Sequence, residues 1–188
     1  MSCVFYRAIL GRVGRVSKAQ AEKNRERVVD VAAHLFRGRG IAGVSVADVM
    51  AEAGLTPGGF YKQFASKDAL IAEAVRAAFA EQEPTLAVPG DEASRRAFVD
   101  RYLSEEHRDH PDQGCPCAGF GGDLARGPHE ARQAFTEGVE ADARHLARDD
   151  EDGLADLCTL VGAIILARAT GGTDLSGRIL AAARSALQ

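Results

Sequence analysis

Hydrophobic residues recur every three or four positions along most of the chain, which is the spacing of one face of an α-helix. In the first such region, residues 22–37, the apolar positions are Val28, Val31, Ala32, Leu35 and Phe36. Similar patterns fill residues 91–188, with breaks at 110–117, 126–128, 149–153 and 171–174. No segment alternates apolar and polar residues with the period of two that a half-buried strand shows. The pattern therefore predicts an all-α protein.

The segment SVADVMAEAGLTPGGFYKQFASKDAL is typical of two short helices joined by a tight turn. Its first residue, Ser45, can cap a helix while Asp48, three residues on, reaches back to the free amides. Gly54 ends this helix, and Thr56 with Pro57 begins the next one as cap and first-turn residue. A turn of about three residues between two helices is the arrangement of a helix-turn-helix.

The second of these helices is expected to present one face to the core and the other to DNA. Phe60 and Phe64 lie four residues apart and so share the core face. The residues left for the opposite face are Thr56, Gly58, Gly59, Tyr61, Lys62 and Gln63. Two glycines at the start of the helix remove side-chain bulk, so that backbone amides can come close to phosphates.

The run AGLTPGGFYKQFASKDAL resembles the DNA-binding domain of the TetR family of bacterial transcriptional repressors, of the AcrR-like type. The resemblance covers roughly residues 20 to 80. It implies phosphate contacts from Ser45 and Thr56, and a phosphate or base contact from Tyr61. It also implies that Lys62 and Gln63 face base edges and that Lys67 takes a phosphate.

Net charge is −4, which alone argues against nucleic acid, but the charge is unevenly distributed. Residues 1–66 carry a net charge of +5 and residues 67–188 a net charge of −9, so the basic part is the part expected to face DNA. An N-terminal stretch of basic residues is a candidate for phosphate contacts: Arg12, Arg15, Lys18, Lys23, Arg25 and Arg27. The overall acidity disfavours a protein that coats DNA without sequence preference.

We expect four parts along the chain. A helix that begins at the Ser66 cap and runs to about Glu81 leads out of the DNA-binding region, and PTLAVPGD, with two prolines and a glycine, predicts a turn or extended segment after it. The predicted parts are a flexible basic arm (1–17), a three-helix helix-turn-helix domain (18–65), a connecting helix and linker (66–90), and a helical effector-binding and dimerisation domain (91–188). A later start of translation, at Val13 or Val16, fits the sequence that follows.

No apolar run approaches the roughly 18 residues of a membrane span, and Arg7 interrupts the only candidate for a signal peptide. The sequence therefore predicts a cytoplasmic protein that does not enter a membrane.

The last two helical regions predict a homodimer. Residues 154–170 are apolar nearly all round, and residues 175–187 add an alanine-lined helix, so both need burial on several sides. Cys158 is expected to be a core residue. The resemblance implies that these two helices of each subunit form a four-helix dimer interface, which sets two recognition helices along the DNA.

The resemblance also implies a pocket for a small-molecule effector among the C-terminal helices. Candidates for its lining are Phe98, Tyr102, His107, Cys117, Phe120, Phe135 and His145. The predicted function is a repressor that binds a palindromic double-stranded DNA operator and is released by the effector. No cofactor is expected, and the lack of a nucleophile motif or paired carboxylates disfavours an enzyme.

Cys115 and Cys117, with His107, His110 and His129 nearby in sequence, are the remaining candidates for chemistry. Structural zinc sites use two pairs of ligands at defined spacing, and a Cys-x-Cys pair beside scattered histidines does not match, so no metal site is predicted. A Cys115–Cys117 disulfide would close a very small, strained ring. The alternative function is a redox-responsive repressor that senses oxidants or electrophiles through Cys115 or Cys117.

Overall fold

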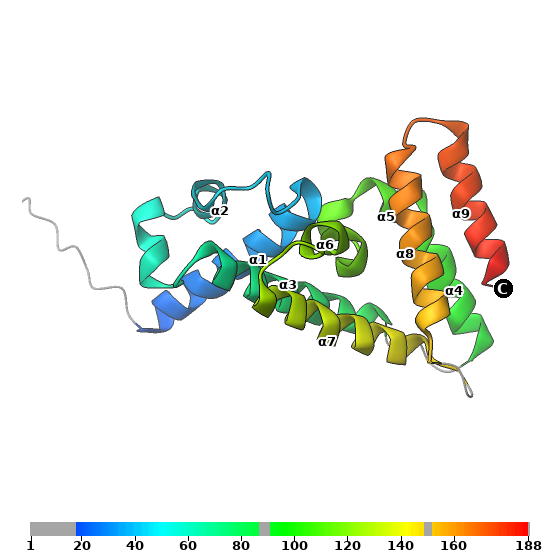
Figure 1. Cartoon of the computed structure of the whole chain (residues 1–188), viewed down its shortest axis with the longest axis horizontal. Helices are drawn as coiled ribbons and strands as arrows, with labels where there is room; N and C mark the ends of the chain where they lie inside the picture. The colour runs from blue at the N-terminus through cyan, green and yellow to red at the C-terminus, as the bar shows by residue number, and fades with distance from the viewer. Residues whose placement is uncertain (1–17, 87–90, 149–151, 188) are drawn as a thin grey trace, which may run out of the picture.

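The computed structural model describes residues 18–86, 91–148 and 152–187. Within these ranges the regular elements are helices, which confirms the all-α prediction (Figure 1). In chain order they are α1 (Lys18–Arg39), α2 (Val46–Glu52), the 3₁₀-helix η1 (Pro57–Lys62), α3 (Lys67–Leu86), α4 (Glu92–Tyr102), α5 (Glu105–Asp109), η2 (Pro111–Gln113), α6 (Pro116–Leu124), α7 (His129–Leu146), α8 (Leu154–Ala169) and α9 (Asp174–Ala186).

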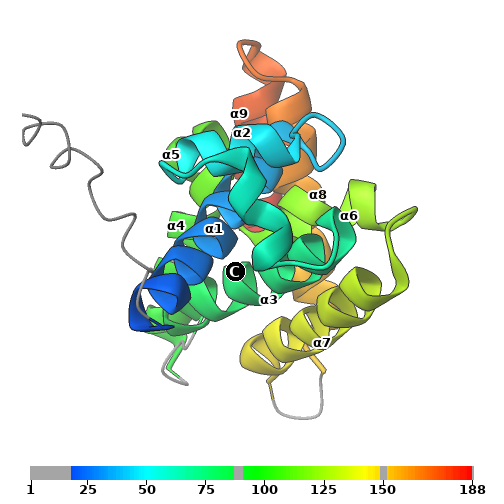
Figure 2. The same ribbon diagram turned by 90° about the vertical axis from the view of Figure 1, so that its left-hand side faces the viewer.

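The molecule is elongated, with α1 and α2 toward one end and α8 and α9 at the other (Figure 1). Between them α3 and α7 run side by side, as the view along the long axis also shows (Figure 2). The two long helices therefore connect the end expected to face DNA to the rest of the chain.

The first helix of the helix-turn-helix forms as its sequence predicts. Ser45 is the N-cap of α2: its hydroxyl oxygen accepts a hydrogen bond from the Asp48 amide (3.1 Å), and the Asp48 carboxylate accepts one from the Ser45 amide (2.8 Å). These reciprocal bonds satisfy two amides that a helix leaves free at its start. The helix then buries Val49 and Met50 in the core.

The second helix differs from the α-helix that was predicted, because it is a 3₁₀-helix. Gly59 donates its amide proton to the Thr56 carbonyl (3.0 Å), and Gln63 donates to the Phe60 carbonyl (2.8 Å), both with the three-residue spacing of a 3₁₀-helix. Two consecutive glycines have low helix propensity, and a segment of six residues is short enough for this geometry. Phe60 and Phe64 are buried and stack at 5.3 Å, as predicted.

The connecting helix α3 continues to Leu86, beyond the predicted end near Glu81, and includes Pro84. Proline lacks an amide proton and so removes one helical hydrogen bond, which a helix tolerates more easily within its last turn. The expectation of a turn or extended chain from residue 84 was therefore wrong for 84–86. Residues 87–90 and the predicted arm at 1–17 lie outside the described ranges.

The apolar core of the DNA-facing end extends past the predicted domain boundary. Phe120 and Leu124 of α6 are buried in the same cluster as the helix-turn-helix core. Phe79 of α3 and Phe135 of α7 pack at 5.9 Å and contact both this cluster and a second one formed with α4, α8 and α9. A Cβ added at Gly138 would lie 2.4 Å from the Phe79 ring, so this glycine permits the close packing of α3 and α7.

Helices α8 and α9 pack against each other and leave an apolar surface exposed. Its large side chains are Leu154, Ile165, Leu166 and Leu175, of which Leu166 is 57% exposed. Cys158 is exposed on α8, so its predicted place in the core of the chain was wrong. None of the described helices is long and apolar enough to cross a lipid bilayer.

Candidate functional site

One end of the molecule presents a polar surface, here called the η1 surface, which consists of Ser45, Thr56, Gly58, Tyr61 and Lys62. All five residues are exposed, and Tyr61 is 76% exposed although its ring touches that of buried Phe60. A Cβ added at Gly58 would meet nothing within 4 Å, so the backbone there is open to an approaching molecule. The η1 surface contains five of the eight residues predicted to contact DNA.

Two of the other three predicted residues face the protein in part. A Cβ at half-buried Gly59 would lie 3.6 Å from the Met50 side chain, so this position faces the core. Gln63 is also half-buried, and its Oε1 lacks a hydrogen-bond partner among the described residues. The prediction that Gly59 and Gln63 lie on the DNA side of the helix therefore holds only in part. The reason is that a 3₁₀-helix turns 120° per residue, whereas an α-helix turns 100°.

The third, Lys67, has a structural role that the sequence did not suggest. Its Nζ donates hydrogen bonds to the carbonyl oxygens of Ile41 (2.8 Å) and Val44 (2.6 Å) and lies 5.7 Å from the centre of the Phe36 ring. An ammonium has three N–H donors, of which two are used to hold the loop between α1 and α2. Lys67 therefore anchors this loop, and its contact with a phosphate stays a prediction.

Some basic residues of α1 are exposed, and others bind within the protein. Lys18, Lys23 and Arg27 are exposed on its surface. Arg25 instead pairs with Glu73 of α3 (2.6 Å) and lies over the ring of Phe64. Arg12 and Arg15 lie outside the described residues.

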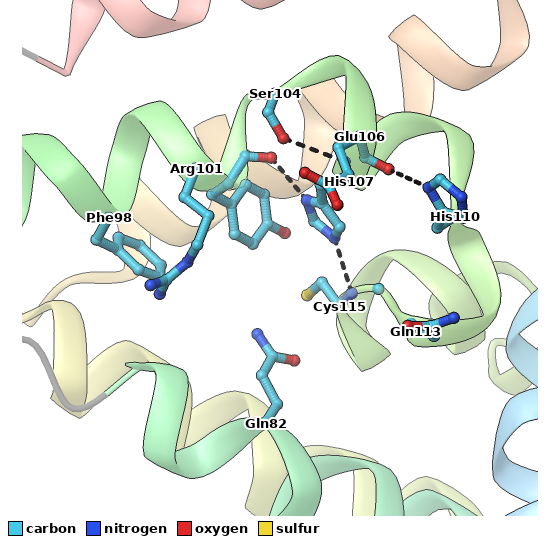
Figure 3. A pocket seen from close by; sticks show the side chains of 11 residues that line it. Gln82, Phe98, Arg101, Ser104, Glu106, His107, His110, Gln113 and Cys115 are labelled. Atoms are coloured by element: carbon cyan, nitrogen blue, oxygen red, sulfur yellow. Dashed lines mark hydrogen bonds between the residues drawn. The ribbon is translucent and has the colours of Figure 1, made fainter.

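A cavity of about 430 Å³ lies among α3, α4, α5 and the segment that leads into α6 (Figure 3). It is lined by Gln82, Phe98, Arg101, Tyr102, Ser104, Glu106, His107, His110, Gln113, Gly114 and Cys115. Three of the predicted effector residues, Phe98, Tyr102 and His107, are among them. The lining combines aromatic rings with several hydrogen-bonding side chains, which is typical of a small-molecule site.

The other four predicted effector residues do not line this cavity. Phe120 is fully buried in the core, and Phe135 packs against Phe79. Cys117 is buried behind the cavity wall, and His145 is exposed on α7. Sequence distance could not separate these residues from those that line the cavity, because helices bring together residues far apart in the chain.

His107 fixes one wall of the cavity. Its Nδ1 donates a proton to the Tyr102 carbonyl (2.6 Å), and its Nε2 accepts one from the Cys115 amide (3.0 Å; Figure 3). Both ring nitrogens are thus used by the neutral ring, and burial lowers the pKa of His107 despite the opposing effect of the Tyr102 carbonyl. The ring therefore holds Cys115 in place beside Tyr102.

Residues 28–74 match the family model for bacterial regulatory proteins of the tetR family. This match spans most of α1, the whole helix-turn-helix and the first part of α3. The chain therefore has a DNA-binding domain of the tetR type. It is a helix-turn-helix transcriptional regulator.

Solved structures of this fold cover nearly the whole chain. NemR of E. coli in its reduced form is 17% identical, with a TM-score of 0.74 over 88% of this chain and 95% of NemR. A TetR regulator of Chloroflexus aurantiacus is 23% identical (TM-score 0.68, 90% of this chain and 94% of that one). A regulator of Legionella pneumophila is 18% identical (TM-score 0.70, 87% and 94%). A search of curated proteins gives no match.

The chain also contains a group of buried residues, here called the thiol cluster, which consists of Cys115, Cys117, Asp142 and Tyr102. Cys115 is the N-cap of α6, Cys117 lies in its first turn, and Asp142 comes from α7. All four are buried. The Cys117 thiol donates a hydrogen bond to the Asp142 carboxylate (3.5 Å). Both cysteines are candidates from the sequence, but Asp142 is not among the predicted residues. Its signal in the sequence is its position on the apolar face of α7 beside Ala143 and Leu146.

The thiol cluster has unusual protonation equilibria. Burial opposes ionisation of Cys115, but hydrogen bonds from the Cys117 thiol, the Tyr102 hydroxyl and helix amides lower its pKa to about 6. The hydrogen bond to Cys115 and burial raise the pKa of Cys117 far above its usual value. Burial and the nearby Cys115 charge raise the pKa of Asp142 to about 7. One negative charge is therefore favoured on Cys115, and further ionisation beside it is resisted.

Three contacts join the cavity wall and α6 to the DNA-facing helices. Buried Arg37 of α1 donates hydrogen bonds to the Gly114 carbonyl (3.3 Å) and to Glu81 of α3 (2.6 Å). The Ile41 amide, after α1, donates to the Asp123 carboxylate of α6 (2.6 Å). The Asp112 carbonyl lies 3.0 Å from Nδ1 of His34. No local motif indicates the contacts of Gly114, Asp123 and Asp112 with the DNA-facing helices, because each joins residues more than 75 positions apart.

Proposed function

We propose that the protein is a homodimeric repressor that binds a palindromic operator through the η1 surface and is released when a small molecule occupies the cavity. Three features support this proposal: an exposed DNA-facing surface, an exposed apolar surface for a second subunit, and a cavity bonded to the DNA-facing helices. They lie at different places along the elongated molecule, as a regulator with separate input and output requires (Figure 1).

The exposed surface of α8 and α9 is the proposed dimer interface. Leu154, Ile165 and Leu166 of α8, with Leu175 of α9, are 43% to 57% exposed, although large apolar side chains are usually buried. A second copy of the same two helices would cover them in a four-helix contact. Two recognition segments joined in this way can read two half-sites, which a single short helix cannot do with specificity.

The observation that carries the proposal is the bond between Arg37 and Gly114. Gly114 lines the cavity, and Arg37 belongs to α1, which packs beneath α2. A ligand that displaces the Gly114 segment must change this hydrogen bond or move α1 with it. An effector only has to bind the DNA-incompetent arrangement more tightly, and a coupling of about 1–3 kcal/mol is typical.

The cavity favours an effector that is partly aromatic and carries hydrogen-bonding groups. Phe98 and Tyr102 offer apolar ring surface, while Gln82, Ser104 and His110 add polar groups on other walls. A volume of about 430 Å³ suits a molecule of modest size.

The test is selection of bound fragments from the flanking genomic DNA, followed by fluorescence anisotropy with the selected operator and a scrambled duplex. We expect the wild-type dimer to prefer the operator by at least about 10³-fold at physiological salt. Leu166→Glu should yield monomers that lose this preference, whereas Glu137→Gln, on the exposed side of α7, should retain it. Equal affinity for both duplexes would make the protein a non-specific DNA binder.

A second candidate is release by oxidants through Cys115, which the low pKa of this thiol favours. The thiolate would attack one oxygen of a peroxide and break the O–O bond, so that the sulfur is oxidised to sulfenic acid and hydroxide leaves. If Cys115→Ser protein still leaves the operator on peroxide treatment as the wild type does, this candidate is wrong.

A further inference from the structure

We propose that Cys115, Cys117 and Asp142 form a binding site for a thiophilic divalent cation of the Zn²⁺ type. Their ligand atoms, two sulfurs and one carboxylate oxygen, all lie within 4.8 Å of one another. In tetrahedral zinc sites Zn–S bonds of about 2.3 Å place neighbouring ligand atoms about 3.8 Å apart. The Cys117 sulfur and the Asp142 oxygen are already 3.5 Å apart, so small side-chain rotations would complete the geometry.

The buried carboxylate of Asp142 favours a cation at this cluster. Asp142 is 3% exposed, and among the described residues its hydrogen-bond partner is the Cys117 thiol, with no basic side chain in an ion pair with it. Buried carboxylates in proteins are normally paired with a cation or coordinate a metal. Asp156, a half-buried acid of the same chain, has such a pair with Arg95 (2.5 Å).

Tyr102 forms one wall of this site. Its side chain is 5% exposed, and its hydroxyl lies beside the Cys115 sulfur.

The first turn of α6 favours the thiolate form that a metal requires. Cys115 is the N-cap of α6, so its sulfur lies near the positive end of the helix dipole. Pro116 between the two cysteines occupies the first helical position, where its fixed backbone angle is suitable and its missing amide proton is not needed. The Cys-Pro-Cys sequence thus presents both sulfurs from one rigid turn.

Three protein ligands leave a fourth tetrahedral position open, which distinguishes this site from a closed structural zinc site. Cys115 lines the cavity, so an exchangeable ligand can reach the metal from there. The donor set of two thiolates and one carboxylate selects zinc, cobalt or cadmium over magnesium or calcium, which prefer oxygen ligands alone.

Metal binding at this site would also change operator affinity, and this consequence rests on the proposed repressor function. The metal would join the start of α6 to α7, while the same helix α6 holds the loop after α1 through Asp123 and Ile41. A shift of α6 toward α7 would therefore act on the DNA-facing helices. Metal binding itself does not depend on this step and is tested separately.

The test is a titration of the full-length, chelator-treated protein with Co²⁺ in the presence of a non-thiol reductant and without DNA. We expect one Co²⁺ per chain, with a thiolate-to-cobalt charge-transfer band, visible bands of tetrahedral Co²⁺, and displacement of cobalt by Zn²⁺. Cys115→Ser and Cys117→Ser should each lose the charge-transfer intensity. Asp142→Asn should weaken Co²⁺ binding by at least about 100-fold.

Two matched variants serve as controls. Cys158→Ser removes a thiol outside the cluster, and Glu140→Gln removes an exposed carboxylate from the same helix as Asp142, so both should bind Co²⁺ as the wild type does. Circular dichroism checks that each variant is folded. The absence of a charge-transfer band in folded wild-type protein, or unchanged binding in folded Asp142→Asn, would overturn the site.

The regulatory consequence has its own readout. Zn²⁺ should lower operator affinity of the wild type at least about tenfold and leave that of Asp142→Asn unchanged. Metal binding without any effect on operator affinity would overturn the signal but retain the site. A protein that binds Co²⁺ but no operator would overturn the proposed repressor function instead.

Discussion

Two tyrosines show how differently the two halves of this regulator use their polar groups. Tyr61, on the η1 surface, is 76% exposed and turns its hydroxyl to solvent beside a buried phenylalanine. Tyr102, at the end of α4, is 5% exposed, and its hydroxyl lies in the thiol cluster beside the Cys115 sulfur. The first can contact a partner that comes from outside, whereas the second contacts groups of its own chain.

The difference extends to the surroundings of each residue. Around Tyr61 the fold supplies a rigid apolar base, formed by Phe60 and Phe64, on which exposed groups can change without disturbing the core. Around Tyr102 the polar groups are buried and pack against one another, so each substitution there changes both the charge and the free energy of unfolding. Substitutions at the η1 surface should therefore affect binding alone, whereas substitutions in the thiol cluster should affect protonation and stability together.

The largest effect is expected at Phe60, next to Tyr61. Phe60→Ala removes a fully buried ring and should lower the free energy of unfolding by about 3–5 kcal/mol. Tyr61→Ala should change it by less than about 0.5 kcal/mol, because the ring is exposed. Urea denaturation followed by circular dichroism measures both free energies of unfolding. Similar losses in the two variants would contradict the division into a buried apolar base and an exposed surface.

A smaller effect, with a pH dependence, is expected for Asp142→Asn in the metal-free protein. Burial raises the folded-state pKa of Asp142 from 3.8 to about 7, so the folded protein holds this proton more tightly than the unfolded chain. The resulting stability is complete below about pH 4 and is lost as the pH rises to about 7.

The Asp142→Asn variant avoids this loss of stability, because an amide side chain has no proton to release as the pH rises. We expect metal-free Asp142→Asn to be more stable than the wild type at pH 8, by up to about 4 kcal/mol, with no such gain at pH 4. Thermal unfolding of both proteins across this range measures the difference. If the melting temperatures of the two proteins change with pH in the same way, the pKa of Asp142 is not raised in the folded protein.

Lys67→Ala should lower the free energy of unfolding by about 1–2 kcal/mol, because the Ile41 and Val44 carbonyls lose a charged donor. The salt dependence of operator binding should stay as in the wild type. A slope of log affinity against log salt that falls by about one would instead assign Lys67 to a phosphate.

The smallest stability change is expected for Gly58→Ala. The added methyl group meets no protein atom and reduces the freedom of the unfolded chain, so stability should rise by about 0.5 kcal/mol. Operator affinity should fall at the same time, because the methyl group lies where the backbone is open to DNA. Unchanged affinity would show that Gly58 does not approach the DNA.

The same contrast explains what could be predicted from the sequence. The cap formed by Ser45 and Asp48 and the buried pair Phe60 and Phe64 depend on residues three or four positions apart, and they were predicted correctly. The thiol cluster joins Tyr102 and Cys115 to Asp142 of another helix, and sequence spacing does not encode such neighbours. Cys158 was assigned to the core because α8 is apolar on all sides. Such a pattern does not show which side of the helix is exposed.

Operator affinity of Tyr61→Ala, measured by fluorescence anisotropy beside its melting temperature, tests the central claim most directly. If the η1 surface reads DNA, the variant should bind the selected operator about 10- to 100-fold more weakly while remaining a dimer with the melting temperature of the wild type. Wild-type affinity in this folded, dimeric variant would contradict the assignment of the η1 surface to DNA.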